Sequence, residues 1–298
     1  MDSKTKGGRA HHHPRVEDDA LLRGAGHFVA DRREPDQVYA SFVRSPHAFA
    51  HIIKIDIEQA REAKGVLAVL TAADMEAAGV GNVGRHPPLA GRGGGKLVIP
   101  SRPALARDRV MHVGEAVAMV IAETQLAALD AAELVEVTYE ESRPVVDLVE
   151  AVQADAPQLW PEAPGNIAID WPGLAADPDA NAREVDRIIA AAAQVARVEV
   201  RNQRLIVATM EPRGATASYD AASDTYTLRT CSQSAGTLRE NVLGIMNWPK
   251  QRLRVITEDV GGAFGLKTGA YPEYLAALVG AKLLGRPVHW MSGRSKRS

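Results

Sequence analysis

The first part of the chain alternates strand-like and helix-like stretches. QVYASFVRS (37–45) and HIIKIDI (51–57) are rich in β-branched and aromatic residues and flank a turn, so they are predicted to be strands. EQAREAKG and TAADMEAAG are predicted helices, the second with Thr71 as its N-cap. RVMHVGEAVAMVIAET, QLAALDAAEL and VEVTYEE then give strand, helix and strand. The pattern predicts one compact mixed domain over residues 17–148.

Two regions lack such a pattern. Residues 79–96 are rich in glycine and proline without periodicity, which predicts a long exposed loop. Their spacing fits neither a P-loop nor a dinucleotide-binding loop, and we assign them no ligand. Residues 149–180 carry many prolines, which predicts a linker that wraps over a surface.

Periodicity returns over residues 181–298, where we expect a second mixed domain. REVDRIIAAAAQV is a predicted helix, and strands are expected within residues 199–235. YPEYLAALVGAKLLGRP predicts the clearest helix. Pro272 suits its first position, Gly285 its end, and the apolar side chains that repeat at helical spacing are Leu275, Leu278, Val279 and Leu283.

Composition narrows the function classes. The chain has 298 residues, is 46% hydrophobic and carries a formal net charge of −2, so no global field favours nucleic acid or an anionic membrane. No stretch approaches the roughly 20 apolar residues of a membrane span, and the N-terminus does not resemble a secretory signal. We expect a cytoplasmic protein whose residues 1–16, including His11 to His13, form a disordered tail. The single cysteine, Cys231, excludes an internal disulfide and a Cys-ligated iron–sulfur cluster within this sequence.

The candidate chemistry lies in EDVGGAFGLKTGAYPEY, residues 258–274. Glycines here permit positive φ and let successive N–H groups bind an anion, although a tight strand-to-helix turn would look the same. Gln233 follows a predicted strand and precedes a predicted helix. Its amide could enter a cleft or could be simply exposed.

Other polar residues have structural interpretations. Glu211 and Arg213 flank a proline, as expected for structural ion pairing at a strand corner. Cys231 is expected to be a buried inert thiol, and His289 and Trp290 to pack in the core or an interface. No Ser/His/Asp, Cys/His or H-E-x-x-H arrangement is present, so no catalytic or metal-ligating residue is assigned.

Several stretches in order carry a family resemblance: VEDDALLRGAGHFVAD, YASFVRSPHAFAHI, RVMHVGEAVAMVIAET, DAAELVEVTYEE, RNQRLIVATMEPRGATASYD, CSQS and EDVGGAFGLKTGAYPEY followed by LLGRPVHW. Together they resemble the molybdopterin-binding large subunit of the xanthine dehydrogenase/aldehyde oxidase family, particularly its carbon monoxide dehydrogenase-like branch. The resemblance runs from about Val16 to Trp290. It implies an α+β fold, with an α/β hammerhead domain followed by the first part of a molybdenum-cofactor-binding domain.

The resemblance also implies a site and partners. Gly262, Ala263, Phe264 and Gly265 would lie against a molybdenum–pterin cofactor, and Gln233 would approach the metal's oxo ligand. FAD would be held by a medium subunit and 2Fe-2S clusters by a small subunit. The implied reaction is oxidation of an aldehyde, an N-heterocycle or carbon monoxide with water as oxygen source.

Two departures qualify the resemblance. Purine-oxidising relatives carry a Glu where this chain has Lys267-Thr268, which does not support a purine substrate. The family's base, a Glu near the end of its subunit, has no counterpart, and Lys296-Arg297-Ser298 stands where an acidic residue is expected. We therefore expect a truncated or split subunit that is inactive alone and that pairs with a C-terminal half. A scaffold that binds the flavin or iron–sulfur subunit, and a disrupted gene product, are the alternatives.

Overall fold

The computed structural model describes residues 15–84, 89–203 and 205–293. His11 to His13 and the terminal Lys296-Arg297-Ser298 lie outside the described residues. The fold is α+β, as expected from the sequence. None of the helices in the described ranges is long and apolar enough to cross a membrane.

The strands and helices follow the sequence pattern closely in the first 150 residues. The strands are β1 (Val38–Arg44), β2 (Ala50–Asp56), β3 (Val66–Leu70), β4 (Arg109–Val110), β5 (Ala116–Ala122), β6 (Glu136–Glu141), β7 (Gly214–Asp220), β8 (Thr225–Thr230), β9 (Leu253–Ile256) and β10 (Val288–Met291). The helices are α1 (Asp18–Leu22), α2 (Glu58–Glu62), α3 (Ala72–Ala77), α4 (Gln125–Ala132), α5 (Leu148–Ala151), α6 (Pro178–Ala191), α7 (Ala235–Met246) and α8 (Pro272–Leu284). Short 3-10 turns occur at η1 (Val29–Asp31), η2 (Arg92–Gly94), η3 (Pro164–Asn166) and η4 (Lys250–Arg252).

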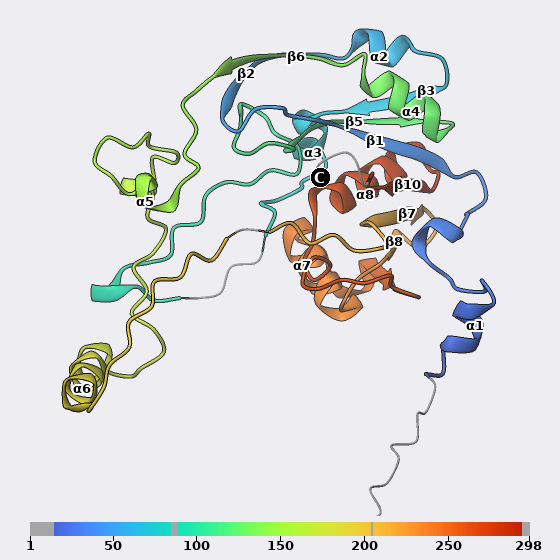
Figure 1. Ribbon diagram of the computed structural model, residues 1–298. Coiled ribbons are helices and arrows are strands. Elements are labelled where there is room, and N and C mark those ends of the chain that lie inside the picture. The colour runs from blue at the N-terminus through green and yellow to red at the C-terminus, as the bar shows by residue number, and fades with distance from the viewer. Residues whose placement is uncertain (1–14, 85–88, 204, 294–298) are drawn as a thin grey trace, which may run out of the picture.

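A seven-stranded sheet joins the two ends of the chain. Its order is β3-β5-β1-β10-β7-β8-β9, and a second sheet has the order β4-β2-β6. The parallel pair of β1 and β10 places Val38 beside Val288. The N–H of Val38 also donates to the carbonyl of Pro287 at 2.8 Å. Strands far apart in sequence therefore share one framework (Figure 1).

The buried strand β5 explains how the core is built. All seven of its residues are buried. Met119 and Ile121 belong to a cluster that includes the apolar residues of α8, and the alternating Ala118 and Val120 pack with Ala131 of α4. Because side chains of a strand alternate between faces, helices on both faces bury the whole strand.

Helix α8 begins at Pro272 and ends before Gly285, as predicted. Leu275 and Leu278 are fully buried, and Val279 is partly buried against the same core, which confirms three of the four expected apolar positions. Leu283 is the exception, since it is 60% exposed at the last turn. The helix lies on the part of the sheet that holds β7 and β10, so it stabilises the region that carries the candidate loop.

A long arm leaves this body and carries α5 and α6 (Figure 1). The predicted helix within residues 183–195 is confirmed as part of α6, which has no buried residue. The strands expected in residues 199–213 are wrong, because the described part of this stretch forms no strand. A strand needs a hydrogen-bonding neighbour, and both sides of β7, which follows, are occupied by β8 and β10.

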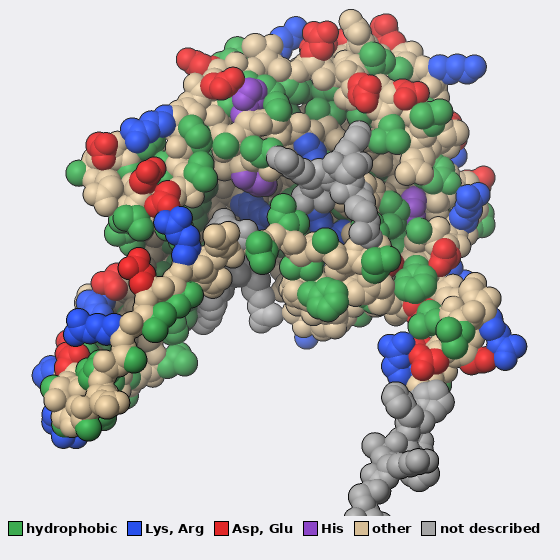
Figure 2. Space-filling view, viewed as in Figure 1, with side chains coloured by type: hydrophobic (Ala, Val, Ile, Leu, Met, Phe, Trp, Pro, Cys, Tyr) green, Lys and Arg blue, Asp and Glu red, His purple; other side chains and the backbone are tan. Residues whose placement is uncertain are grey.

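The arm consequently exposes apolar side chains among charged ones (Figure 2). Those with the largest exposed fractions after α6 are Val198, Val200, Leu205, Ile206 and Met210, each near 80%. Such a concentration of exposed apolar surface is typical of a region that another polypeptide covers.

Candidate functional site

The glycine-rich loop between β9 and α8 is fastened to the segment that precedes β7. Glu211 accepts a hydrogen bond from the N–H of Gly261 at 2.9 Å, and its own N–H donates to the Gly261 carbonyl at 3.0 Å. A Cβ at position 261 would lie 2.5 Å from the Cβ of Glu211, so close packing requires glycine there.

A buried ion pair fixes the other end of the loop. Lys267 Nζ lies 2.9 Å from Glu211 Oε2, and their side chains are 0% and 8% exposed. The other carboxylate oxygen of Glu211 accepts the N–H of Val29 at 3.3 Å. Because Lys267 is buried in this ion pair, it cannot contact a substrate.

Glu211 and Arg213 have structural roles, but within the described residues they form ion pairs with other side chains and not the expected pair with each other. Glu211 pairs with Lys267, while Arg213 pairs with Glu273 on α8 at 3.1 Å. The Glu273 carboxylate also accepts a hydrogen bond from the guanidinium of Arg44 of β1 at 2.6 Å. Burial alone would raise the pKa of Glu273, but the two guanidinium groups lower it below its ordinary value.

Gln233 is held against the loop by its backbone and its side chain. Its N–H donates to the Lys267 carbonyl at 2.9 Å, and its side-chain oxygen accepts the Lys267 N–H at 3.3 Å. Only the amide oxygen can accept a hydrogen bond, so this contact directs the amide NH₂ away from Lys267. The side chain is exposed, and among the residues that the structure describes its amide NH₂ donates no hydrogen bond.

The tip of the loop presents backbone donors and one aromatic side chain. Gly262 and Gly265 have φ of +91° and +90°, and Phe264 has φ of +48° with 78% of its surface exposed. Within the described residues, no hydrogen bond is donated by the N–H groups of residues 262–265. The structure therefore places Gln233 beside the C-terminal end of the loop and leaves Phe264 uncovered at its tip.

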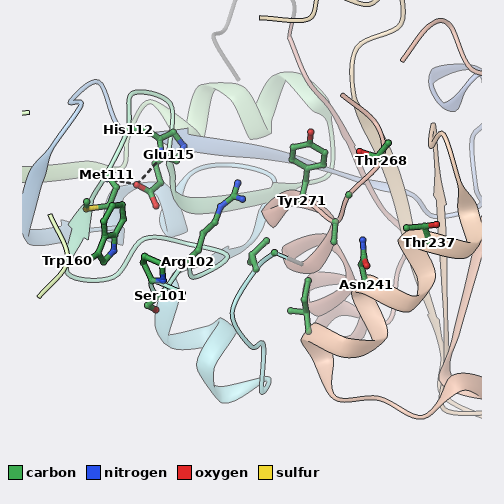
Figure 3. Close-up of a pocket in the computed structure, with 16 residues that line it drawn as sticks. Ser101, Arg102, Met111, His112, Glu115, Trp160, Thr237, Asn241, Thr268 and Tyr271 are labelled. Atoms are coloured by element: carbon green, nitrogen blue, oxygen red, sulfur yellow. Dashed lines mark hydrogen bonds and ion pairs between the residues drawn. The ribbon is translucent and has the colours of Figure 1, made fainter. Parts of the chain in front are cut away.

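A cavity of about 770 Å³ begins where the loop ends. Thr268 and Tyr271 form one wall, and Thr237 and Asn241 of α7 continue it. The opposite wall comes from distant parts of the chain. It includes Ser101, Arg102, Met111, His112, Glu115 and Trp160 (Figure 3). None of Gln233 and residues 262–265 lines this cavity, so it adjoins the loop rather than containing it.

Sequence reasoning did not find the cavity residues. Arg102 and Trp160 lie in irregular segments, and neither belongs to a recognisable motif. Only the three-dimensional fold brings them opposite α7, so no local signal could have indicated them.

The remaining candidates are structural, as expected. Cys231 is 1% exposed, and burial together with the nearby Glu211 carboxylate raises its pKa. Such a thiol is a poor nucleophile at neutral pH. His289 and Trp290 are buried in β10, and Trp290 contacts Phe42 and Tyr274 edge to face.

Comparison with known proteins identifies the two domains of the chain. Residues 23–143 match the sequence model of the aldehyde oxidase and xanthine dehydrogenase a/b hammerhead domain, and residues 161–298 match that of the molybdopterin cofactor-binding domain. The chain belongs to the xanthine dehydrogenase/aldehyde oxidase family. Its two parts are the hammerhead domain and the start of the molybdenum-cofactor-binding domain, as the sequence resemblance implied.

Individual relatives are similar over nearly the whole chain. The carbon monoxide dehydrogenase large chain of Afipia carboxidovorans is 34% identical, covering 94% of this chain and 34% of the relative. The nicotine 6-hydroxylase large subunit of Paenarthrobacter nicotinovorans is 32% identical, with coverage of 94% and 33%. The crystal structure of quinoline 2-oxidoreductase from Pseudomonas putida 86 superposes with a TM-score of 0.80 at 30% identity, with coverage of 95% and 34%. The chain thus spans about a third of the length of these large subunits.

The loop suits the cofactor that the family implies. A molybdenum–pterin group offers oxo and phosphate oxygens, which accept hydrogen bonds. The N–H groups of residues 262–265 and the amide of Gln233 are donors without a described protein partner, and the loop tip carries no carboxylate that would repel those oxygens. Within the described ranges, no group of three His, Cys, Asp or Glu side chains could hold a metal ion directly.

Proposed function

We propose that this chain supplies part of the cofactor and substrate site of a molybdenum hydroxylase-type oxidoreductase. The reaction class is oxidation of an aldehyde, an N-heterocycle or carbon monoxide with water as oxygen source. The observation that supports it best is the double hydrogen bond between Gln233 and Lys267, which aims a free amide NH₂ outward beside unpaired loop donors. The cofactor, when bound, would supply two-electron redox chemistry at molybdenum.

The chain's own residues would hold and orient that cofactor. The N–H groups of Gly262, Ala263, Phe264 and Gly265 would donate to its oxygens, and Gln233 would donate from the strand end. The exposed ring of Phe264 would shield one side of the site from water. The buried pair of Lys267 and Glu211 would keep the loop in place without touching the cofactor.

We infer that the proton acceptor for turnover comes from another polypeptide segment. Glu211 is buried against Lys267, and Cys231 is buried with a raised pKa, so neither is free to act as a base at the loop. On this proposal the chain is inactive by itself. It contributes groups that donate hydrogen bonds to the cofactor, and it contributes no catalytic residue.

The partner subunits are inferred from the redox groups that this sequence cannot bind. One cysteine cannot bind a 2Fe-2S cluster, which needs about four ligands. Electrons would therefore leave through a small 2Fe-2S subunit and a medium FAD-binding subunit. A C-terminal half of the large subunit would cover the apolar arm around residues 198–206. We propose a cytoplasmic location, where a free thiol such as Cys231 stays reduced.

Co-expression tests this function. The chain would be produced, in a host that makes molybdenum–pterin, together with the part of the Afipia carboxidovorans large chain that it does not match. We expect a complex that retains molybdenum and pterin, measured by metal analysis and by fluorescence of the oxidised pterin. Gln233→Leu should weaken retention about tenfold through the lost hydrogen bond, and Gln203→Leu on the exposed arm should not.

Two outcomes would contradict the proposal. Dye-linked oxidation by the isolated chain would show that no further polypeptide is needed. A stable complex that carries flavin and iron–sulfur partners but no pterin would instead support the scaffold function.

A further inference from the structure

The cavity beside the loop contains an unpaired positive charge. Within the described residues, no hydrogen bond or ion pair is made by the guanidinium of Arg102. Glu115 also lines the cavity, and its carboxylate accepts a hydrogen bond from the N–H of Met111 at 2.6 Å and lies 3.5 Å from His112 Nδ1. Figure 3 shows Arg102 reaching into the space between Glu115 and Tyr271. Its charge is free for a ligand.

A second source of positive charge lies behind the opposite wall. The guanidinium of Arg213 stacks over the ring of Tyr271, with its central carbon 3.8 Å from the ring centroid. Arg213 and Arg44 share the single buried carboxylate of Glu273. Two guanidinium groups and one carboxylate leave this cluster of Arg44, Arg213 and Glu273 with a net charge of +1. Burial reduces the screening of that charge by solvent.

The size and the aromatic lining of the cavity define the rest of the ligand. A volume of about 770 Å³ lies in the range of small-molecule sites. Trp160 and Tyr271 stand on different sides of it (Figure 3) and offer flat apolar surfaces. Hydroxyl and amide groups of Thr237, Asn241 and Thr268 add hydrogen-bonding positions along α7 and the loop end.

We propose that this cavity selects a planar aromatic or heteroaromatic substrate that carries a carboxylate, and that Arg102 is the residue that determines this selectivity. The carboxylate would bind the Arg102 guanidinium, and the ring would lie among Trp160 and Tyr271. The role as substrate cavity rests on the proposed function, because Thr268 directly follows the residue that anchors the cofactor loop.

Binding of two probes of the same shape tests the inference on the full chain without cofactor. Benzoate and benzamide differ by one negative charge, and ligand-observed NMR titration at low ionic strength gives the affinity of each. We expect benzoate to bind about tenfold more tightly than benzamide, as for a charge-assisted hydrogen bond. Added salt should reduce the difference.

Three substitutions separate recognition from folding. Arg102→Gln should abolish the preference for benzoate, while Arg102→Lys should keep part of it because the charge remains. Arg183→Gln is the matched control, since Arg183 is exposed on α6 at the far end of the arm and should leave both affinities unchanged (Figure 1). Thermal unfolding of each variant would verify that the fold is intact.

Equal affinities for the two probes, no binding of either, or an unchanged preference in Arg102→Gln would each overturn the inference. These results are distinguishable from failure of the proposed function. A complex that retains pterin but shows no preference for benzoate rejects only the selectivity. A chain that prefers benzoate but never retains pterin keeps the binding site and rejects the oxidoreductase.

Discussion

Lys267 and Glu211 form an ion pair of 2.9 Å with almost no exposed surface, 56 residues apart in sequence. The same carboxylate accepts N–H groups from Gly261 and Val29. The Glu211 side chain thus connects the N-terminal segment, the segment before β7 and both ends of the glycine-rich loop. The loop tip can be exposed and still hold a defined shape because its base is fixed in this way.

Removing Lys267 should destabilise the fold strongly. Lys267→Met leaves the Glu211 carboxylate buried without a counter-charge, and the free energy of unfolding should fall by about 3–5 kcal/mol. Urea unfolding followed by circular dichroism would measure the loss. The double variant Lys267→Met/Glu211→Gln should lose less than the sum of the two single variants, because no charge is then left unpaired.

The control for this prediction is an exposed pair on the arm. Arg187 and Glu184 on α6 pair at 2.6 Å with more than half of each side chain exposed. Arg187→Met should not change the unfolding midpoint measurably. A similar effect of Arg187→Met and Lys267→Met would show that the burial of the Lys267 pair has no energetic role.

Two glycines should respond in opposite directions to alanine. Gly261→Ala forces a methyl group against Glu211 and should destabilise the chain by about 1–3 kcal/mol. Gly244 is exposed inside α7, with no atom within 4 Å of an added Cβ. Gly244→Ala should therefore stabilise by about 0.5–1 kcal/mol through helix propensity. Unfolding midpoints in one denaturant series would compare the two, and equal shifts of the same sign would contradict this prediction.

His289 should make stability depend on pH in the acid range. Burial, with the positive charge of Arg33, lowers its pKa to about 4. An unfolded histidine takes up its proton near pH 6.5, so the unfolded state binds protons first as the pH falls. The His289 contribution is complete above about pH 6.5 and is lost towards pH 4, by about 3 kcal/mol in total.

The variant His289→Gln isolates this contribution. Free energies of unfolding for the wild type and the variant would be measured at several pH values. Their difference should change between pH 6.5 and pH 4 and be constant above pH 7. A difference that does not vary with pH would show that His289 has the same pKa in the folded and unfolded states.

The arm should be cleaved by protease before the packed body of the fold. Arg197 and Arg201 are exposed and belong to no helix or strand. Brief trypsin treatment should cut after them before it cuts at Arg239, which lies in α7 and donates to the Leu253 carbonyl at 2.7 Å. Mass spectrometry of the early fragments gives the order. Protection of Arg197 and Arg201 in the co-expressed complex would support coverage of the arm, and initial cleavage at Arg239 would contradict the prediction.

Sequence predicted the elements whose signals are local. Pro272 and Gly285 define the ends of α8, and Thr71 caps α3, because these preferences act within one helical turn. The stretch 199–213 was predicted as strand because it contains β-branched residues, but strand formation depends on a neighbour that this chain does not place beside it. The same distinction between local signals and tertiary contacts applies to the candidate site. The glycine-rich loop and Gln233 were visible as motifs, whereas the pairing of Lys267 with Glu211 and the position of Arg102 arise only from tertiary contacts.

The central place of β10 constrains how the molecule can be made. The strands β3, β5 and β1 can pair with one another early, and β7, β8 and β9 can do so later. Among the described strands, β10 alone bridges the two groups. A nascent chain on the ribosome would therefore hold two unjoined half-sheets until residues 288–291 emerge. Because such distant contacts slow folding, this protein should depend more than most on chaperones during synthesis.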